Sequence, residues 1–402
     1  MRRRILLAVS GGIAAYKVPE LVRALDRGGH AVRCVLTEAA TRFVSPLVLQ
    51  TLTREPVRTS LLDPGQEGQI GHIDLADWAE AAVVAPATAN VLAKLAHGIA
   101  DDAVTTVLLA TRAPLLVAPA MNVNMWEHPA TQANLALLRA RGVQFVGPDA
   151  GELACGWEGA GRMSEPAAIA GAVELVLGTK SLAGERVVVT AGGTREPIDG
   201  VRALVNRSSG KMGFALAAEA ARRGAAVVLV AGPSALATPA GVRRIDVETA
   251  LDMRAAVLAE LPAATAVVMA AAVADFRPAE PIAGKLKKED LAEGAGLELR
   301  LVQNPDILAE VSRDRGSKIV VGFAAESRDV IAAARRKLLR KGCDLIVAND
   351  VSRSDAGFES DRNAVALLDA AGEVEELPLL DKSEVAARIW DRIEKLRGAR
   401  RG

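Results

Sequence analysis

The chain has 402 residues, enough for two to three domains of ordinary size, each with a buried core. Hydrophobic residues make up 50% of it and charged residues 24%, a composition that excludes a globally disordered protein. Lysine plus arginine and aspartate plus glutamate number 49 each, so the formal net charge is zero. This balance argues against a protein that coats nucleic acid or anionic membrane, and the aromatic content of 3% argues against base-stacking surfaces.

The three cysteines, Cys34, Cys155 and Cys343, lie far apart and form no CxxC pair, which favours a reducing compartment. The histidines are scattered as well, so no zinc-ligand cluster is evident. The start, MRRRILLAVSGGIAAYK, has the charge pattern of a signal peptide, but its apolar run breaks at Ser10 and fits a first buried strand better. No apolar stretch reaches the roughly 18 residues of a membrane span. We therefore predict a cytoplasmic protein with no membrane partner.

Short apolar runs alternate with amphipathic stretches along the whole chain, as in α/β proteins with parallel sheets. The strands predicted in the first half are Arg4–Val9, Ala31–Leu36, 81–85, 114–118 and 143–146, with helices such as 16–27 and 131–141 between them. The strands predicted in the second half are 186–190, 226–230, 265–270, 318–321 and 345–348. A polar linker near residue 181 predicts domains at 1–180 and 181–402. The predicted fold is two Rossmann-like three-layer α/β domains with mostly parallel sheets.

The loops that follow the strands are the candidate sites, because ligands of open α/β sheets bind where strands end and helices begin. The first strand runs into Ser10, Gly11 and Gly12, where glycines would let a phosphate approach N–H groups at the start of a helix. The GxGxxG fingerprint is absent, so this loop indicates phosphate or nucleotide binding without indicating NAD; a plain tight turn is the alternative. Two more polar loops, 85–90 and 119–126, follow other strands and together favour a binding crevice.

Two titratable residues of the first half are candidates for catalysis. His72 precedes a predicted helix; a lone histidine is more often a surface or core residue, although its side chain titrates near neutral pH. Cys155 lies in the glycine-rich stretch 151–161, which is typical of a flap. A cysteine there could donate a proton or act as a nucleophile, and by itself it could equally be inert.

Five segments of the first half together resemble the flavin-dependent cysteine decarboxylases: SGGIAAYK, GHIDL, APATAN, PAMNVNMW and ACG. They are most similar to the decarboxylase half of the bacterial bifunctional phosphopantothenoylcysteine decarboxylase/phosphopantothenate–cysteine ligases of coenzyme A biosynthesis. The resemblance covers about residues 1–178 and implies a flavoprotein-type domain with FMN and the catalytic residues His72, Asn122 and Cys155. The implied FMN-binding residues are Ser10, Gly11, Gly12, Thr37, Thr88, Asn90 and Met121.

The chemistry that the resemblance implies accounts for these residue types. A cysteine carboxylate has no electron sink of its own, and FMN supplies one by first taking a hydride equivalent from the thiol-bearing carbon. Decarboxylation then gives an enethiolate, and the reduced flavin returns the hydride. In this scheme His72 is the base, Asn122 holds the substrate carboxylate, and Cys155 protonates the enethiolate from a closing flap.

The second half has its own polar loops at strand ends. The strand 186–190 runs into a glycine turn, again without GxGxxG, and the later GK pair is no P-loop because Val205 and Met212 replace required residues. Lys285 opens the basic run KLKK, for which a solvated surface is the alternative to a functional role. Glycine loops, separate basic groups and an asparagine-containing loop suggest a nucleoside triphosphate and a second phosphorylated ligand.

This half resembles the ligase half of the same bifunctional family from about 185 to 390, through TAGGTREPID, VNRSSGKMG, AAVADFRP, KLKK, NPDI, GFAAES and ANDVS. The resemblance implies a ligase-type domain in which CTP activates 4′-phosphopantothenate as an acyl-cytidylate, pyrophosphate leaves, and cysteine forms the amide. Asn206 would contact the pantothenate side and the acyl-cytidylate, Arg202 would bind or convert that intermediate, and Lys285 would stabilise the departing pyrophosphate from a flexible lid. The other implied substrate-binding residues are Ala271, Asp275, Asn304, Pro305, Asp306, Ile307, Phe323, Lys337 and Lys341.

The halves would catalyse consecutive steps, because the ligase product is the decarboxylase substrate and 4′-phosphopantetheine is the net product. The resemblance also implies Mg²⁺ carried on CTP, with its protein ligands unknown, and homo-oligomers with trimeric decarboxylase and dimeric ligase contacts. One alternative is a two-domain nicotinamide oxidoreductase, which the missing GxGxxG disfavours. Another is a non-catalytic regulatory flavin-binding subunit, which would lack His72, Asn122 or Cys155. The basic tail 397–402 is more typical of a frayed end than of a nucleic-acid site, so no nucleic-acid partner is expected.

Overall fold

The structure is a computed structural model of the chain, and it describes residues 2–61, 71–152, 156–287, 289, 296–326, 329–350 and 360–401. The chain separates into two compact units, Met1–Gly178 and Thr179–Gly402, which we call unit 1 and unit 2. Among the described residues, no helix is long and apolar enough to cross a lipid bilayer.

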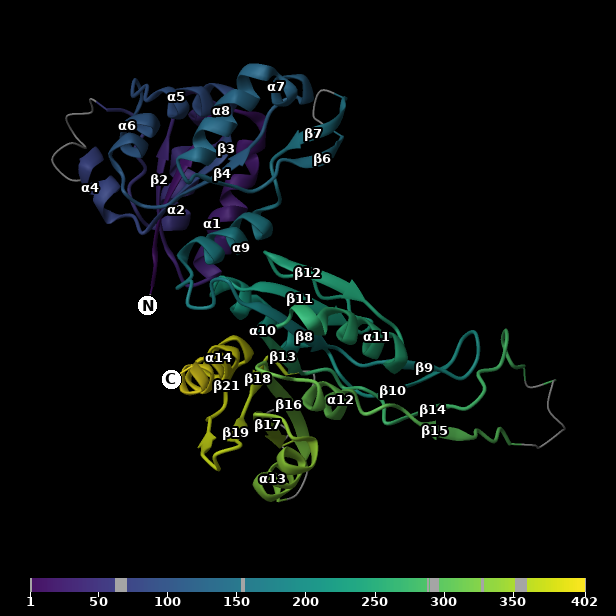
Figure 1. Ribbon diagram of the computed structural model, residues 1–402. Coiled ribbons are helices and arrows are strands. Elements are labelled where there is room, and N and C mark those ends of the chain that lie inside the picture. The colour runs from purple at the N-terminus through teal and green to yellow at the C-terminus, as the bar shows by residue number, and fades with distance from the viewer. Residues whose placement is uncertain are drawn as a thin grey trace. The chain divides into compact units, whose positions relative to one another are not determined.

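Unit 1 is built on a five-stranded parallel sheet (Figure 1). Its strands are β1 (Arg4–Val9), β2 (Ala31–Leu36), β3 (Ala81–Ala87), β4 (Leu115–Pro119) and β5 (Gln144–Phe145). Their order is β2-β1-β3-β4-β5, and every residue of the central strand β3 is buried, because helices cover both faces. The chain order reverses between β1 and β3, and ligands of such sheets bind at the carboxyl ends of the strands that flank the reversal.

Helices form the outer layers of unit 1. They are η1 (Ile13–Lys17), α1 (Val18–Arg27), η2 (Glu38–Arg42), α2 (Pro46–Thr53), α4 (His72–Trp78), α5 (Ala89–His97), α6 (Ala103–Ala110), α7 (Val123–Glu127), α8 (Pro129–Ala140) and α9 (Pro166–Leu177). Side chains alternate along β1, so Ile5 and Leu7 pack with α1 and α9, whereas Leu6 and Ala8 pack with α5, α6 and α8. An antiparallel hairpin of β6 (Asp149–Glu152) and β7 (Glu158–Arg162) lies between β5 and α9 in the chain.

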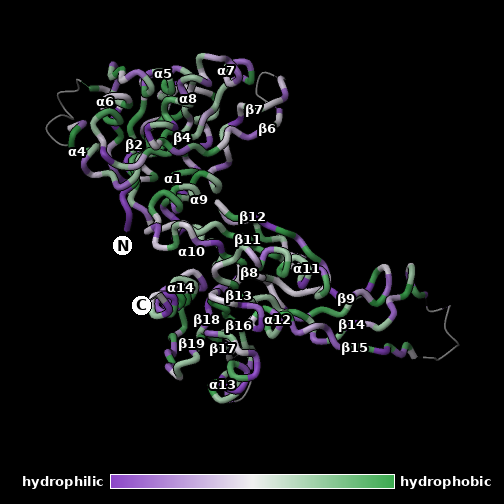
Figure 2. Tube along the Cα trace, viewed as in Figure 1, coloured by the Kyte–Doolittle hydropathy of each residue, from purple (hydrophilic) through white to green (hydrophobic). Residues whose placement is uncertain are grey.

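Unit 2 contains an eight-stranded, mostly parallel sheet. Its strands are β8 (Arg186–Ala191), β11 (Ala226–Ala231), β12 (Val242–Asp246), β13 (Ala266–Met269), β16 (Ile319–Glu326), β17 (Leu345–Asp350), β19 (Val365–Asp369) and β20 (Val374–Glu376). The order is β12-β11-β8-β13-β16-β17-β19-β20, in which neighbours from β12 to β17 pair in parallel and β19 and β20 pair antiparallel. Figure 2 shows the apolar trace concentrated along the central strands of both units.

The helices of unit 2 also cover both faces of its sheet. They are α10 (Lys211–Arg222), α11 (Ala250–Glu260), η3 (Leu261–Ala263), α12 (Ile307–Arg313), α13 (Val330–Lys341) and α14 (Lys382–Arg401), and the short pair β18 (Arg362–Asn363) with β21 (Leu380–Asp381) precedes α14. One core joins α11, α12 and α13 to the sheet. On the other face α10 packs against α14, where the fully buried Trp390 donates its Nε1–H to the carbonyl oxygen of Leu216 at 2.9 Å.

Two short antiparallel pairs extend from the sheet of unit 2 (Figure 1): β9 (Arg195–Pro197) with β10 (Ala203–Val205), and β14 (Phe276–Pro278) with β15 (Leu301–Gln303). We call residues 195–205, 276–287 and 296–303 the arm. The Asp199 carboxylate accepts N–H groups of Val201 at 2.8 Å, Arg202 at 2.7 Å and Leu286 at 3.3 Å. Burial opposes ionisation of Asp199, but the N–H groups and the Arg202 guanidinium outweigh it and lower its pKa to about 2. One carboxylate thus ties two segments of the arm together.

The predicted fold class is confirmed, since both units are three-layered and their sheets are mostly parallel. The predicted strands Arg4–Val9 and Ala31–Leu36 match β1 and β2, whereas 81–85 and 318–321 extend further, to Ala81–Ala87 and Ile319–Glu326. The arm strands and the edge strand β12 were not predicted.

Candidate functional site

Four loops meet at the carboxyl edge of the sheet in unit 1. Ser10 follows β1, Thr37 follows β2, Thr88 follows β3, and Met121 comes two residues after β4. The buried Ser10 hydroxyl donates to the carbonyl oxygen of Pro86 at 2.7 Å and accepts the N–H of Thr88 at 3.1 Å. The loops after β1 and β3 are therefore joined at the point where the strand order reverses.

The glycines after β1 present backbone, not side chains, to this crevice. A Cβ on Gly11 would lie 2.5 Å from the Cβ of Ala39, so the loop and η2 are in contact with no room for a side chain. Gly12 begins η1 with extended backbone and no side-chain cap. Bare backbone at the start of a helical turn suits a phosphorylated cofactor. The other predicted FMN residue of this edge, Asn90, lies exposed in the first turn of α5.

Asn122 caps the start of α7, on the same sheet edge, where its Oδ1 accepts the N–H of Asn124 at 2.8 Å. The preceding residue, Met121, donates its N–H to the carbonyl oxygen of Gly161 in β7 at 3.0 Å, so the hairpin β6–β7 is held beside α7. The predicted catalytic residue Cys155 falls between β6 and β7 and lies outside the described residues.

His72 lies elsewhere in unit 1. It is the half-buried first residue of α4. Figure 1 shows α4 and α7 at opposite sides of the unit, so a single copy of the chain does not bring His72 to Asn122.

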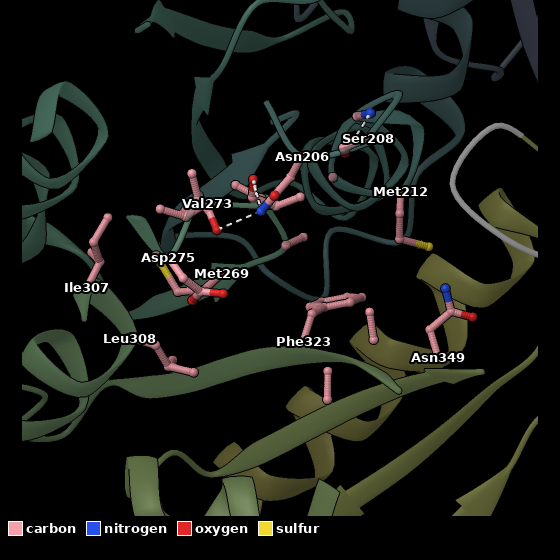
Figure 3. Close-up of a pocket in the computed structure, with 18 of the residues that line it drawn as sticks. Asn206, Ser208, Met212, Met269, Val273, Asp275, Ile307, Leu308, Phe323 and Asn349 are labelled. Atoms are coloured by element: carbon pink, nitrogen blue, oxygen red, sulfur yellow. Dashed lines mark hydrogen bonds between the residues drawn. The ribbon is translucent and has the colours of Figure 1, made fainter. Parts of the chain in front are cut away.

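A pocket of about 790 Å³ opens at the carboxyl ends of β13, β16 and β17 in unit 2 (Figure 3). Its volume is typical of sites for nucleotide-sized ligands. The residues predicted for substrate binding that line it are Asn206, Ala271, Asp275, Asn304, Pro305, Asp306, Ile307, Phe323, Lys337 and Lys341.

The loop after β13, which carries Asp275, is fixed from several sides. Asn206 donates its Nδ2–H to the carbonyl oxygen of Val273 at 3.0 Å, as the dashed line in Figure 3 shows. Asn304 donates from Nδ2 to the carbonyl oxygen of Ala274 at 2.8 Å. Because two amides predicted to bind substrate also hold this loop, they set the position of Asp275 at the pocket.

Two ammonium groups from α13 face the same pocket. Lys337 donates from Nζ to the carbonyl oxygen of Phe323 at 2.7 Å; burial lowers its pKa, and the nearby Lys341 lowers it further. Lys341 pairs with Asp306, the cap of α12. Burial opposes ionisation of Asp306, but the Lys341 ammonium outweighs it and holds the pKa of Asp306 below its ordinary value. Positive charge four residues apart on one helix suits a phosphorylated ligand.

Arg202 and Lys285 lie on the arm and are not among the described residues that line the pocket. Arg202 donates from Nε to Asp199 at 2.9 Å and from Nη2 to the carbonyl oxygen of Leu286. Lys285 is exposed beside Leu286. The predicted roles of Arg202 and Lys285 therefore require the arm to reach a pocket.

Residues 1–177 match the family model described as Flavoprotein, and residues 182–396 match that of the DNA/pantothenate metabolism flavoprotein C-terminal domain. Relatives named Coenzyme A biosynthesis bifunctional protein CoaBC are similar over almost the whole chain. That of Escherichia coli K12 is 49% identical over 393 residues, covering 97% of this chain and 96% of the relative. That of Vibrio cholerae is 47% identical over 394 residues, covering 98% of each. The chain belongs to the coenzyme A biosynthesis bifunctional protein family.

Solved structures resemble each part of the chain. The C-terminal domain of a coenzyme A biosynthesis bifunctional protein CoaBC is 39% identical, covers 54% of this chain and 98% of that chain, and has a TM-score of 0.46. A PPC decarboxylase mutant complexed with pantothenoylaminoethenethiol is 34% identical, covers 44% of this chain and 98% of that chain, and has a TM-score of 0.39.

In this member of the family the pocket also contains residues that the sequence did not single out. They are Lys211, Met212, Asn349, Asn363 and Lys382, among others. Asn349 had a detectable signal, because it lies in the strand-end motif ANDVS. The signal of Lys382 is weaker: it begins a helix, where an acidic residue would be the favourable choice. Within the described residues, no group of three or more His, Cys, Asp or Glu side chains could hold a metal ion.

Proposed function

We propose that the chain carries out two consecutive reactions of coenzyme A biosynthesis, ligation in unit 2 and decarboxylation in unit 1. Unit 2 would join 4′-phosphopantothenate to cysteine at the expense of CTP. Unit 1 would convert the resulting 4′-phosphopantothenoylcysteine to 4′-phosphopantetheine with FMN. The observation that carries the proposal is an identity of 47–49% over 97–98% of the chain with relatives named as bifunctional proteins of this pathway.

The unit 2 pocket supports a CTP-dependent ligation. Lys337 and Lys341 would face the nucleotide, and Asp275 and Asp306 are the carboxylates among the described lining residues. Mg²⁺ binds nucleotides through their phosphates and one or two carboxylates, so these two side chains suit an ion carried on CTP. Asn206, held in place by the loop after β13, would contact the carboxylate of 4′-phosphopantothenate while it is activated as an acyl-cytidylate.

The crevice of unit 1 fits FMN, because the loop from Ser10 to Gly12 offers bare backbone and is joined to Thr88 across the strand reversal. Bound FMN supplies the hydride acceptor and donor that the decarboxylation needs. The chain's own residues would bind the substrate and move protons. Asn122 would hold the substrate carboxylate, His72 would act as the base, and Cys155 would donate the final proton.

We infer that the protein acts as a homo-oligomer with trimeric contacts in unit 1 and dimeric contacts in unit 2. His72 and Asn122 lie at opposite sides of unit 1, so a shared substrate would have to bring them together from two copies. Large apolar side chains are exposed on η1, α2 and the arm, as interfaces require: Ile13, Tyr16, Leu47, Val48, Val201, Val205, Phe276 and Leu301. The arm of one copy could then carry Arg202 and Lys285 to the pocket of another.

We place these reactions in the cytoplasm. Cys34 and Cys343 are buried free thiols, which suits a reducing compartment. Burial raises the pKa of Cys34 to about 12 and that of Cys343 to about 11, so neither is a reactive thiolate at neutral pH.

The proposal is tested by incubating the purified chain with 4′-phosphopantothenate, cysteine, CTP and Mg²⁺ and analysing the products by mass spectrometry. We expect 4′-phosphopantetheine, and its formation should require both CTP and bound FMN. A parallel reaction with ATP in place of CTP measures nucleotide preference. Accumulation of 4′-phosphopantothenoylcysteine would leave the ligase and overturn the decarboxylase, as in a regulatory flavin-binding subunit. No product at all from an FMN-loaded chain would overturn the whole proposal.

A further inference from the structure

Two helices of unit 2 begin at one end of the pocket, and each begins with a lysine that lines it. Lys211 is the first residue of α10, whose capping residue Gly210 has a φ of 76° and provides no side-chain cap. Lys382 is the first residue of α14. The helices are packed together, and Arg223 of α10 donates to Glu394 of α14 at 3.0 Å. Their N-terminal ends are therefore held in a fixed relation at the pocket.

The surroundings of Lys382 disfavour a positive charge. The residue is only 7% exposed, and it stands at the N-terminal end of a 20-residue helix, where the helix dipole is already positive. Burial lowers its pKa, and the neighbouring Lys211 lowers it further, while Asp361 opposes the shift. Its Nζ donates to the carbonyl oxygen of Ser360 at 2.5 Å. A bound anion would offset all three unfavourable contributions at once.

The counter-ion of Lys211 can be displaced. Asp361 accepts from the Lys211 ammonium at 2.6 Å, but its side chain is 85% exposed. Ion pairs with so exposed a partner contribute little to stability, so a doubly charged phosphate could replace the carboxylate at small cost.

A further polar group at the same end of the pocket awaits a partner. Asn349, in β17, is 9% exposed, and its Oδ1 has no hydrogen-bond partner among the described residues. Figure 3 shows Asn349 on the side of Met212, across Phe323 from Asp275 and Ile307. A buried amide without a partner costs free energy until a ligand supplies one. This observation is independent of the two helix ends.

This end of the pocket is separate from the lysines of α13. The charges that act on the pKa of Lys337 are those of Lys341, Arg340, Glu326 and Asp275. Those that act on Lys382 are Lys211 and Asp361, so the two lysine pairs do not influence each other measurably. The pocket therefore has two cationic ends, as a reaction between two phosphorylated substrates would need.

We propose that Lys382, from the C-terminal helix, is a phosphate-binding residue of the unit 2 pocket and forms with Lys211 and Asn349 a site for a phosphate group of one of the two phosphorylated substrates. The inference rests on the proposed ligation and adds to it a residue from a part of the chain that no motif covers. The phosphate belongs either to the triphosphate of CTP or to the phosphomonoester of 4′-phosphopantothenate, and the experiment below separates the two.

The test uses the full-length chain with Lys382→Met, Lys382→Arg and, as a matched control, Lys395→Met. Lys395 lies on the same helix, is 66% exposed and pairs with Glu373 away from the pocket. Calorimetric titrations with CTP, with 4′-phosphopantothenate and with pyrophosphate give the dissociation constants, and steady-state ligation gives the KM of each substrate. Thermal unfolding without ligand is measured for every variant.

We expect Lys382→Met to weaken one phosphorylated substrate at least 10-fold, to leave the KM of cysteine unchanged, and not to lower the unfolding temperature of the unliganded chain. Lys382→Arg should regain most of the lost affinity, and Lys395→Met should bind like the wild type. Weaker CTP and pyrophosphate binding assigns the site to the triphosphate, whereas weaker 4′-phosphopantothenate binding alone assigns it to the phosphomonoester.

Wild-type affinities for both substrates in Lys382→Met would overturn the inference while leaving the ligation intact. A lower unfolding temperature together with equal losses for both substrates would also overturn it, because that result indicates a structural role. Failure of the wild-type chain to ligate at all would instead count against the proposed function.

Discussion

Gly213, in the first turn of α10, offers a sharp test of how tightly the pocket is built. A Cβ at this position would lie 2.5 Å from the Cβ of Ala191 and 2.8 Å from the carbonyl oxygen of Thr190, both at the end of β8. Carbon atoms in contact normally lie about 3.5–4.0 Å apart, so Gly213→Ala must push α10 away from the sheet by about 1 Å. The first turn of α10 lines the pocket and would move with it.

The magnitude follows from two opposing contributions. Overpacking typically costs about 1–3 kcal/mol, whereas replacing glycine by alanine within a helix contributes about 1 kcal/mol of stability. The clash therefore outweighs the helix propensity, and we expect Gly213→Ala to be destabilised by up to about 2 kcal/mol. A displacement of about 1 Å at a positioning element can cost about 100-fold in rate, so ligase kcat/KM should fall between about 10- and 100-fold.

The assay measures each activity separately, ligation by pyrophosphate release and decarboxylation with 4′-phosphopantothenoylcysteine as the supplied substrate. Decarboxylation should be unchanged in Gly213→Ala. The matched control is Gly398→Ala on the exposed side of α14, where no atom lies within 4 Å of the added Cβ; it should gain about 1 kcal/mol and keep both activities. Wild-type ligation in Gly213→Ala, with a gain in stability like that of the control, would refute the reasoning.

Three further substitutions test other contacts. Ser10→Ala removes the hydroxyl that joins two loops of unit 1, which should destabilise that unit by about 1–3 kcal/mol and lower its FMN content; unchanged unfolding and flavin absorbance would contradict this. His72→Asn should retain FMN but block decarboxylation, and full turnover would remove His72 from the catalytic residues. Asp199→Asn should be less stable than the wild type at pH 7. Because the pKa of Asp199 is lowered to about 2, that advantage of the wild type is complete above about pH 4 and should vanish as the pH falls toward 2 in urea titrations. A difference that persists at pH 2 would show that the charge of Asp199 is not its source.

The parallel sheets could be predicted from the sequence because both of their faces are buried. Strands such as Arg4–Val9 and Ala31–Leu36 consist of short apolar runs that end at polar or glycine residues, and these signals are local. The same reasoning gave the loops after the strands, since the carboxyl ends of parallel strands share one edge. The residues from Asn304 to Ile307 and Asp275 therefore meet in one pocket although about 30 positions separate them along the chain.

The arm and the edge of the unit 2 sheet could not be predicted in this way. The arm strands are three residues long, and a carboxylate and its N–H partners from two distant segments hold them together, which leaves no periodic pattern. The edge strand Val242–Asp246 contains two arginines and reads as a polar loop. Lys382 reaches the pocket only because the chain returns through the antiparallel strands β19 and β20 before α14 begins, and that path is set by tertiary packing.

The division of the predicted ligase residues between pocket and arm leads to a prediction about copies of the chain. Asp275 lines the pocket, whereas Arg202 is held on the arm by Asp199. If the arm serves the pocket of another copy, Arg202→Ala chains keep sound pockets and Asp275→Ala chains keep sound arms. Each variant alone should be inactive in ligation. Mixing equal amounts, with subunit exchange, should restore about one quarter of wild-type activity, because half of randomly formed dimers would pair unlike chains and each would hold one complete site.

The outcome separates two arrangements that share the same fold. Restored ligation in the mixture means that Arg202 acts on the pocket of a partner, and the activity should then rise with protein concentration as dimers form. A mixture that stays inactive, although size measurements show exchanged dimers, means that the arm folds back on its own pocket or that Arg202 serves the arm alone. In the second case the bond between Arg202 and Asp199 is structural, and the exposed apolar side chains of the arm, Val205 and Phe276 among them, need another explanation.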